Sequence, residues 1–255
     1  MKVDKDRCIA CKRCFAYCSM GKIQTFKRHD EIRGRVYIEI DQDACTDCGM
    51  CVRAKICPVN ALYQPEETWP REVRSILSNP LIEFKGSSVP GRGTEEMKTT
   101  DVKGTFPPGV VGIGIELGRP GIGSFFRDVE KIAMALAPLG YVFADENPVT
   151  HFMSDRKTGK LLDEVLGEKA TSAIIEGIVP IEKLPEMLRA LQKVSKEINT
   201  VFTLEVITKV TPEGEVPTKP IFNDMGIWYS LVSKNNLGLG EPYFDFYGKD
   251  SNKAS

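Results

Sequence analysis

The chain has 255 residues, of which 42% are hydrophobic, and a formal net charge of −1 at pH 7. This length has room for one small module and one further domain with its own core. The near-zero charge gives no general attraction to nucleic acids or membrane surfaces, and no apolar run reaches the length of a membrane span. We therefore expect no nucleic-acid partner and no membrane insertion.

All eight cysteines lie near the start of the chain, in two runs. The first run has the spacing C-x2-C-x2-C-x3-C and consists of Cys8, Cys11, Cys14 and Cys18. The second has the spacing C-x2-C-x2-C-x5-C, ends before Pro58, and consists of Cys45, Cys48, Cys51 and Cys57. Three cysteine thiolates with two residues between successive cysteines can wrap around one iron–sulfur cube. The fourth ligand must then come from elsewhere in the chain.

With these two runs, residues 1–64 resemble the bacterial ferredoxins that hold two [4Fe–4S] clusters. The resemblance implies crossed ligation, in which the fourth Cys of each run binds the cluster of the other run. One site would then consist of Cys8, Cys11, Cys14 and Cys57. The other would consist of Cys45, Cys48, Cys51 and Cys18. All eight cysteines are thus expected to be metal ligands of two [4Fe–4S] cofactors.

The chain departs from the ferredoxin pattern at two positions. Ser19 follows Cys18, where the family usually has Pro, and the second run has two extra residues before Cys57. Neither departure removes a ligand. His29 lies between the runs, but the cysteines already complete both sites without it.

The alternatives for eight cysteines are a disulfide framework and structural zinc. Disulfide frameworks are typical of small secreted chains, whereas residues 1–6 lack the apolar region of a signal peptide. Zinc sites use pairs of Cys with a longer spacer rather than triplets. We therefore favour clusters, which need reducing surroundings, and expect a cytoplasmic protein of an anaerobic cell.

Charge is unevenly distributed over the cysteine-containing part. Residues 1–36 hold ten Lys and Arg against four acidic residues, and residues 37–72 hold seven acidic residues against three basic ones. Two solvated faces would explain this pattern. The alternative is a module with a basic and an acidic side, which would orient it between an electron donor and an acceptor.

The remaining elements of residues 1–108 are short. The alternation in Val36–Ile40 predicts a strand, and short helices are expected after Cys14 and Cys51. Residues 65–108 are expected to be a long connection, with one or two helical turns in Trp69–Leu77. Gly and Pro in residues 86–101 argue against regular structure there. Gly91, Arg92 and Gly93 could approach an anion or a flat ligand, and a flexible linker is the alternative.

Residues 109–210 have regular patterns of apolar residues. Strands are predicted at 110–118, 141–143, 149–153, 173–179 and 200–210. The segments 141–143 and 149–153 are counted as one strand that is interrupted around Pro148. Helices are predicted after Ser124, as N-cap, up to Gly140, and over 181–198, with a short helix in 161–169. The order β-α-β-β-α-β predicts an α+β chain in which the ferredoxin module is followed by a ferredoxin-like βαββαβ sandwich.

Two features of this second domain suggest binding sites. Gly112 and Gly114 leave the face of the first strand opposite the helices without side chains, so a sheet or planar ligand could lie there. Arg119 and the amides of residues 121–124 meet at a predicted helix N-terminus, which favours anions. No dinucleotide fingerprint is present, because Phe126 stands in the place of the third Gly.

Residues 211–255 form a predicted tail rich in Pro, Gly and aromatic residues. The aromatic residues either dock a partner or pack back onto the chain's own domain. They are Phe222, Trp228, Tyr229, Tyr243, Phe244, Phe246 and Tyr247.

A second resemblance lies in residues 90–99 together with residues 116–121. These stretches resemble the N-terminal part of iron–sulfur proteins of the 6-hydroxynicotinate reductase type. The resemblance implies low-potential reduction of stabilised rings with iron–sulfur and flavin centres. This sequence has no flavin-binding fingerprint.

Three functional hypotheses follow. The first is an electron-transfer subunit of an anaerobic oxidoreductase, with redox partner proteins in a hetero-oligomeric complex. The second is a reductase of an aromatic or heteroaromatic ring, with substrate bound near residues 86–124. The third is a redox-linked regulator that binds a metabolite. Acid–base chemistry would fall to Glu95, Glu96, Glu116, Asp101 or His151, and a carrier needs none of them, which favours the first hypothesis over a self-sufficient catalyst.

Overall fold

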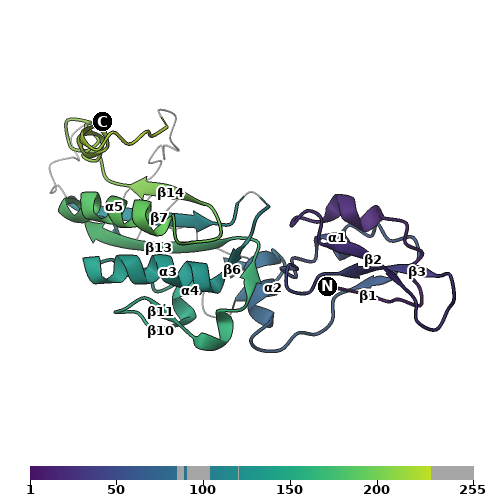
Figure 1. Cartoon of the computed structure of the whole chain (residues 1–255). Coiled ribbons are helices and arrows are strands. Elements are labelled where there is room, and N and C mark those ends of the chain that lie inside the picture. Colours follow the sequence, from purple (N-terminus) through teal and green to yellow (C-terminus); the bar gives the residue numbers. More distant parts are fainter. Residues whose placement is uncertain (85–88, 91–103, 120, 231–255) are drawn as a thin grey trace, which may run out of the picture.

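The computed structural model describes residues 1–84, 89–90, 104–119 and 121–230. These residues form a mixed helix-and-strand structure with two parts at opposite ends (Figure 1). We call residues 1–64 the cysteine region and residues 109–210 the sheet region. Helix α2 lies between them.

The cysteine region contains two small antiparallel sheets. Strand β1 (Lys2–Val3) pairs with β4 (Leu62–Tyr63), and β2 (Gln24–Arg28) pairs with β3 (Val36–Ile40). The predicted strand at Val36–Ile40 is confirmed, as are the short helices at the cysteine triplets. These are the 3-10 helix η1 (Arg13–Tyr17) and helix α1 (Met50–Arg53).

Strand β2 was not predicted from the sequence. Gln24 is its one buried residue and the other four are exposed, so the strand has no alternation of apolar and polar residues. The turn that joins β2 to β3 is held by His29, whose Nδ1 accepts the backbone N–H groups of Glu31 and Ile32 at 3.2 Å. His29 Nε2 lies 2.8 Å from Asp6 Oδ1. His29 therefore has a structural role in this turn.

The connection between the two parts has more regular structure than expected. It contains helix α2 (Glu72–Ser78) and the paired strands β5 (Glu83–Phe84) and β6 (Val89–Pro90). The strand at Val89–Pro90 lies inside the stretch that was expected to be irregular, so that expectation was wrong there. Val73 and Leu77 of α2 are fully buried in the core of the sheet region. Helix α2 thus packs as part of the sheet region.

A four-stranded antiparallel sheet forms the centre of the sheet region. Its strands lie in the order β14 (Phe202–Ile207), β7 (Val110–Leu117), β13 (Ala173–Pro180) and β9 (Val142–Phe143). Two helices pack against it, α3 (Phe126–Leu136) and α5 (Leu184–Val194). The four strands and two helices that the sequence predicted at these places are confirmed.

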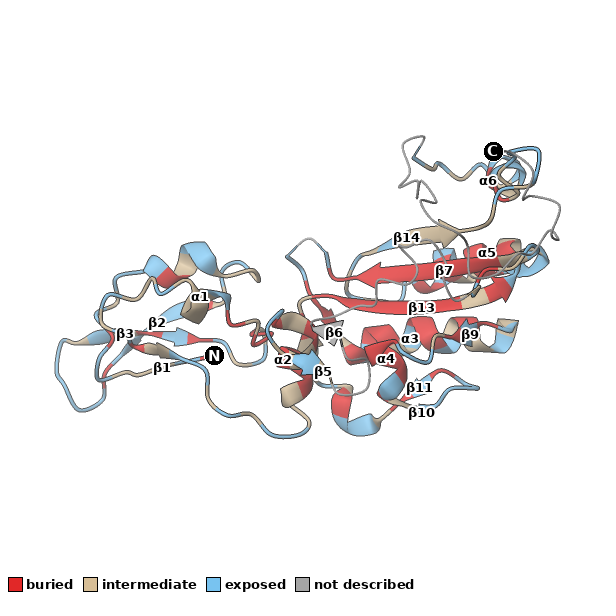
Figure 2. Ribbon diagram, turned by 180° about the vertical axis from the view of Figure 1, so that it is seen from behind, coloured by how far each residue is buried: buried red, intermediate tan, exposed pale blue. Residues whose placement is uncertain are grey.

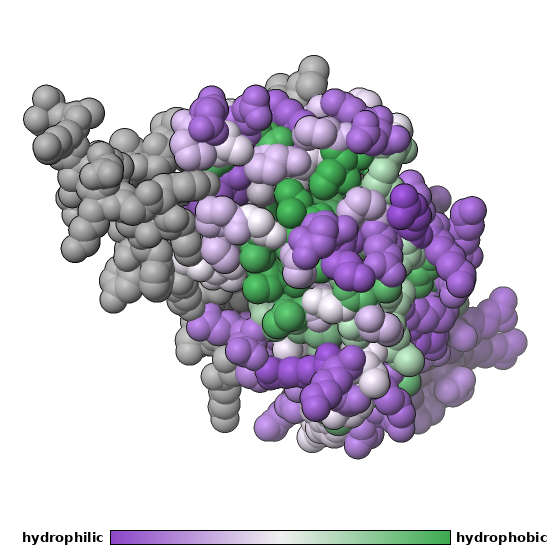
Figure 3. All heavy atoms as spheres, turned by 90° about the vertical axis from the view of Figure 1, so that its left-hand side faces the viewer, coloured by the Kyte–Doolittle hydropathy of each residue, from purple (hydrophilic) through white to green (hydrophobic). Residues whose placement is uncertain are grey.

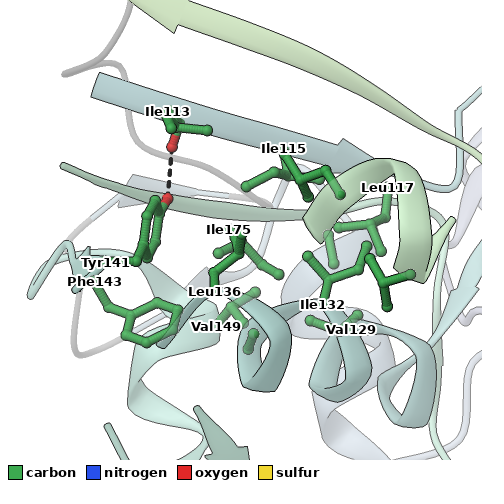
Figure 4. Packing of buried hydrophobic residues seen from close by; sticks show 14 of the residues in the cluster. Ile113, Ile115, Leu117, Val129, Ile132, Leu136, Tyr141, Phe143, Val149 and Ile175 are labelled. Atoms are coloured by element: carbon green, nitrogen blue, oxygen red, sulfur yellow. Dashed lines mark hydrogen bonds between the residues drawn. The ribbon is translucent and has the colours of Figure 1, made fainter. Parts of the chain in front are cut away.

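The apolar face of β7 explains why the helices pack there. Val111, Ile113, Ile115 and Leu117 point to one side and are fully buried with Val129, Ile132 and Leu136 of α3 (Figure 4). Figure 2 shows that buried residues concentrate along β7, β13 and the inner sides of the helices. Each such aliphatic side chain contributes about 1.5–3 kcal/mol by leaving water. The buried Tyr141 hydroxyl donates a hydrogen bond of 2.6 Å to the carbonyl of Ile113.

Residues 148–170 differ from the prediction. The predicted strand at 149–153 is mostly helix α4 (Pro148–His151), whose N-cap is the buried side chain of Asn147, followed by β10 (Met153–Asp155). The predicted helix at 161–169 is instead divided among β11 (Lys160–Leu161), the 3-10 helix η4 (Asp163–Val165) and β12 (Lys169–Ala170). Pro148 begins the helix because its fixed φ suits the first helical position.

The start of α3 also differs from the prediction. Ser124 belongs to β8 (Ser124–Phe125), which pairs with β12, and the N-cap is Phe125. The first amides of α3 are satisfied by backbone carbonyls, because Phe126 N–H donates to Glu168 O and Arg127 N–H to Leu166 O. Short 3-10 helices η3 (Ala137–Leu139) and η5 (Ile181–Lys183) lie after α3 and before α5.

Part of the predicted tail packs onto the sheet region. Helix α6 (Lys219–Asp224) buries Phe222 in the same core, and the Tyr229 ring lies 5.4 Å from the ring of Phe222. Packing back onto the domain is thus confirmed for these two aromatic residues, whereas Trp228 is 86% exposed. Tyr243, Phe244, Phe246 and Tyr247 lie outside the described residues.

Figure 3 shows the end of the sheet region that faces away from the cysteine region, where apolar side chains lie between polar ones. Across the described part of the chain, no helix has both the length and the apolar character needed to cross a lipid bilayer.

The packing around Gly177 generates a test of the sheet. A Cβ atom at Gly177 would lie 2.3 Å from the Val142 carbonyl oxygen and 2.6 Å from the Tyr141 ring. We expect Gly177→Ala to lower the free energy of unfolding by about 1–3 kcal/mol, because β9 must shift to make room. Anaerobic denaturant unfolding followed by circular dichroism measures this.

The matched control is Gly167→Ala. No heavy atom lies within 4 Å of a Cβ at Gly167, and neither glycine has a positive φ. This exposed substitution should change the free energy of unfolding by no more than about 0.5 kcal/mol. Equal stability of the two variants would contradict the packing of β9 on β13.

Candidate iron–sulfur centres

The two cysteine triplets share one backbone pattern. The residue two after the first Cys, Ala10 or Asp47, has a positive φ of 52° or 50°. The residue after the second Cys, Lys12 or Gly49, has a φ of 63° or 70°. Non-glycine residues in this conformation cost about 1–3 kcal/mol each and cluster at functional sites. Each triplet is therefore a loop with two positions in the left-handed backbone region, at least one of them strained.

The first triplet lines a pocket together with a cysteine from the second run. Cys8, Cys11 and Cys14 share this pocket with Cys57. The remaining walls are mostly aliphatic, from Val3, Ile9, Ile38, Ile56, Val59, Ala61 and Leu62, and Lys12 and Arg13 also line it. The structure thus brings Cys57 to the first triplet, across 43 residues of sequence from Cys14.

The thiols of this pocket influence one another electrostatically. Burial, together with the nearby Cys8, Cys11 and Cys57, raises the pKa of Cys14 to about 11, because their thiolates would repel that of Cys14. Four thiols held this close are stable as thiolates only when cations neutralise them. The iron ions of a cluster would do so.

The second triplet has an equivalent arrangement with Cys18. Burial, together with Cys48, Cys45 and Cys18, raises the pKa of Cys51 to about 11. Burial also raises the pKa of Cys45. Each group of four cysteines therefore combines three members of one run with the last member of the other.

Several sulfur atoms accept hydrogen bonds from the chain. Cys8 Sγ accepts the backbone N–H groups of Ala10 and Ile38, both at 3.4 Å, and Cys57 Sγ accepts the N–H of Ala61 at 3.2 Å. At the other group, the Ser19 hydroxyl lies 3.3 Å from Cys48 Sγ. Hydrogen bonds to sulfur are one of the means by which a protein tunes a cluster.

The donor set fits iron–sulfur clusters chemically. Four thiolates around an apolar pocket are the usual environment of a [4Fe–4S] cluster, which takes one thiolate on each iron. Structural zinc sites instead use pairs of Cys with a longer spacer, which the two triplets do not match.

Helix α2 holds the second cysteine run through two arginines that sequence analysis did not single out. Arg71 Nε lies 2.9 Å from Asp47 Oδ2, and the Asp47 side chain is fully buried. Arg74, which is 4% exposed, donates hydrogen bonds of 2.7 Å to the carbonyls of Gln42 and Cys45. Arg74 also pairs with Glu168 of the sheet region. No local pattern in the sequence marks Arg74, because its partners are 29 or more residues away.

The sheet region also contacts the cysteine region directly. Thr46 Oγ1 lies 2.7 Å from Thr171 Oγ1, and a Cβ at Gly121 would lie 3.2 Å from the Ser19 carbonyl oxygen. Residues next to Cys18 and Cys45 therefore touch the sheet region. Cys11 and Lys12 of the first triplet, by contrast, are exposed.

Among the described residues, the other candidates are not brought together into a site. His29 serves the β2–β3 turn, and the His151 ring lies against Phe84 at 5.2 Å. Glu116 pairs with Arg119 at 3.1 Å. Gly91, Arg92, Gly93, Glu95, Glu96 and Asp101 lie outside the described residues.

Two predicted binding features of the sheet region are corrected. Gly112 and Gly114 are buried, so they do not form an open face on β7. The amides of Ile122 and Gly123 both donate to the Gly118 carbonyl, and the first amides of α3 also have carbonyl partners. The expected anion site at residues 121–124 is therefore wrong, because its donors are already used.

Comparison with known proteins gives matches to the cysteine-containing part. Residues 7–61 match the family model described as a 4Fe-4S dicluster domain. Pyruvate synthase subunit PorD of Methanothermobacter marburgensis is 40% identical over 65 residues, which is 26% of this chain and 64% of that protein. The subunit of the same name from Methanocaldococcus jannaschii is 32% identical over 65 residues, 26% of this chain and 65% of that protein.

A third relative is Ferredoxin-3 of a Nostoc species, which is 32% identical over 69 residues, 23% of this chain and 69% of that protein. The chain thus spans less than two thirds of the length of the two pyruvate synthase subunits. No solved structure matches the chain.

The contacts of Arg74 generate a prediction. Arg74→Leu should lower the free energy of unfolding by roughly 3–5 kcal/mol, because it leaves Glu168 and buried carbonyls without a donor. Anaerobic denaturant unfolding of the iron-loaded chain measures the change. The control is Arg156→Leu, since Arg156 pairs with Asp145 on the surface with both side chains exposed. That variant should lose about 1 kcal/mol at most, and an equal loss in both would contradict the role of Arg74.

Proposed function

Through residues 7–61 the chain belongs to the family of 4Fe-4S dicluster domain proteins, and from this premise we propose that it carries electrons through two [4Fe–4S] clusters as a component of a larger, anaerobic oxidoreductase. The proposed ligands of one cluster are Cys8, Cys11, Cys14 and Cys57. Those of the other are Cys45, Cys48, Cys51 and Cys18.

The observation that carries this proposal is the pocket that joins the two runs. Cys57 stands with Cys8, Cys11 and Cys14 in one apolar pocket, which is what crossed ligation requires. A bound [4Fe–4S] cluster supplies one-electron redox chemistry. The chain's own part is to hold the thiolates, limit the access of water through the aliphatic walls, and donate hydrogen bonds to the sulfurs.

A partner protein is proposed at the exposed basic edge of the cysteine region. Lys12 and Arg13 line the pocket of the first triplet and are exposed, and Lys22 is exposed on the same segment. Ile9 and Tyr17 are 56% and 45% exposed beside them. Basic side chains around an apolar patch suit an acidic protein that must approach a cluster closely. The PorD relatives are themselves named as subunits, which supports membership of a complex.

The second candidate is a ring reductase of the 6-hydroxynicotinate reductase type, with substrate near residues 86–124. Its support is the resemblance of residues 90–99 and 116–121, together with one contact. Gly121 and Gly123 lie against Ser19 and Met20, next to the proposed ligand Cys18. A substrate near that loop would lie close to a proposed cluster. Carriage of electrons alone remains our first proposal, because the described acid–base candidates are engaged in structural contacts.

We also propose the division into a ferredoxin module at 1–64, a connection at 65–108, a ferredoxin-like βαββαβ domain at 109–210 and a C-terminal segment at 211–255. The antiparallel order β14-β7-β13-β9 and the packing of α3 and α5 support the third of these. The separate apolar clusters of the cysteine region support the first.

The cluster count and ligation are tested together. Anaerobically prepared protein should hold about eight iron and eight acid-labile sulfide per chain. Cys57→Ala should damage the cluster bound by Cys8, Cys11 and Cys14. Iron analysis and electron paramagnetic resonance of the reduced protein measure this.

Cys11→Ala and Cys48→Ala are the matched controls, one for each site. Under crossed ligation the spectrum of Cys57→Ala resembles that of Cys11→Ala, and the double variant Cys57→Ala with Cys48→Ala loses both clusters. A spectrum like that of Cys48→Ala would contradict the proposed ligand sets. About four iron per chain in the unaltered protein would contradict the two-cluster function.

The basic edge has its own test. The double variant Lys12→Glu and Arg13→Glu should exchange electrons with an acidic carrier protein such as a flavodoxin about tenfold more slowly at low ionic strength. The dependence of the rate on salt should weaken, while the iron content stays the same. Stopped-flow absorbance measures both quantities.

The control makes the same charge change on α5 and just beyond it. Lys193→Glu with Lys196→Glu alters two exposed lysines of the sheet region. This pair should leave the rate within about twofold of the unaltered protein, because it lies on the other part of the molecule. An equal slowing in both double variants would show that net charge, and not the basic edge, controls the rate.

A further inference from the structure

The two runs differ at the residue that follows their fourth cysteine. Pro58 follows Cys57, whereas Ser19 follows Cys18. Proline has no side-chain donor, but the Ser19 hydroxyl lies 3.3 Å from the sulfur of Cys48. Cys48 and Cys18 belong to the same proposed cluster. Ser19 therefore follows one ligand of that cluster, Cys18, in the chain and contacts another, Cys48, through its hydroxyl.

The direction of this hydrogen bond is set by iron. A free thiol and a hydroxyl can each donate to the other. An iron-bound thiolate has no proton, so Cys48 Sγ can then only accept and Ser19 must donate. We propose that Ser19 donates a hydrogen bond to the iron-bound thiolate of Cys48 and thereby raises the reduction potential of the cluster on the second triplet. This inference rests on the proposed two-cluster function.

The physical reason is electrostatic. Reduction adds an electron to the cluster and increases the negative charge on the thiolate sulfurs. A hydrogen bond to a more negative acceptor is stronger, so the Ser19 hydroxyl stabilises the reduced cluster more than the oxidised one. The reduction potential therefore rises, as it does with hydrogen bonds to cluster sulfurs in general.

The position of Ser19 is fixed by the sheet region. Gly121 approaches the Ser19 carbonyl so closely that a Cβ would lie at 3.2 Å, and a Cβ at Gly123 would lie 3.0 Å from Met20 Sδ. Both glycines have positive φ, 68° and 71°, which lets the loop make this approach. Ser19 is half-buried between this loop and the second triplet, so its hydroxyl is held near the sulfur.

This contact differs in kind from the other contacts of the cysteine sulfurs. Cys8 and Cys57 accept backbone N–H groups, which no side-chain substitution removes, and Cys45 Sγ lies near the N-terminal ammonium of Met1 and the carboxylate of Asp47. Between described residues, the contact of Ser19 is the one made by a side-chain hydroxyl to a cysteine sulfur. One substitution can therefore shift one cluster and leave the other unchanged.

The experiment uses the full-length chain loaded with iron and sulfide under anaerobic conditions. Reduction potentials are measured by redox titration followed by electron paramagnetic resonance, and Cys11→Ser marks the cluster of the first triplet. Ser19→Ala should shift the potential of the second-triplet cluster to a more negative value, with the first-triplet potential and the iron content unchanged. Thr25→Ala, which removes an exposed hydroxyl on β2, should shift neither potential.

Ser19→Thr and Ser19→Val provide a pair of equal shape that differs in the hydroxyl. The second-triplet potential should be more negative in the Val variant than in the Thr variant. Equal potentials in that pair, or an equal shift of both clusters, would overturn the inference, and the pair decides the matter if the Ala variant loses iron. A single cluster in the unaltered protein would instead overturn the proposed function, so the two failures are distinguishable.

Discussion

The packing of the cysteine region against the sheet region depends on the hydrogen bonds and the ion pair of the Arg74 guanidinium. This guanidinium is buried, and a buried charge is tolerated only when it is paired and hydrogen-bonded. Its partners are the carbonyls of Gln42 and Cys45 on one side and Glu168 on the other. Separation of the cysteine region from the sheet region would remove the carbonyls of Gln42 and Cys45 and leave the guanidinium paired with Glu168 alone. The second triplet is therefore fixed to the sheet region by electrostatics as well as by packing.

The two cysteine groups consequently have different surroundings. The first triplet ends in exposed residues, Cys11 and Lys12, whereas Thr46 and Ser19 beside the second group contact the sheet region. A carrier with two clusters in series needs one cluster near the surface for a partner protein, whereas the other can face the rest of the chain. In the proposed two-cluster carrier, this asymmetry favours exchange of electrons with a partner at the first triplet.

Sequence reasoning predicted the elements whose apolar pattern is regular and missed those fixed by distant contacts. Strand β7 and helix α3 follow from an uninterrupted period of apolar residues. Strand β2 has one buried residue in five, and α4 was read as a strand because Val149 and Phe152 are apolar. The cysteine spacing identified eight candidate ligands. The roles of Arg74 and Glu168 could not be predicted, because an ion pair across 94 residues leaves no local pattern.

The uneven charge of the sequence also changes meaning in the structure. Residues 37–72 carry the acidic excess and could have formed an acidic surface. However, Asp47 is fully buried against Arg71, and Glu67 pairs with the same arginine. Lys12, Arg13 and Lys22 of the basic half are exposed. Part of the acidic charge therefore stabilises the second triplet internally, while these bases remain for a partner. Glu39, Asp41, Asp43 and Glu66 are exposed as well, so the cysteine region presents both signs of charge to solvent.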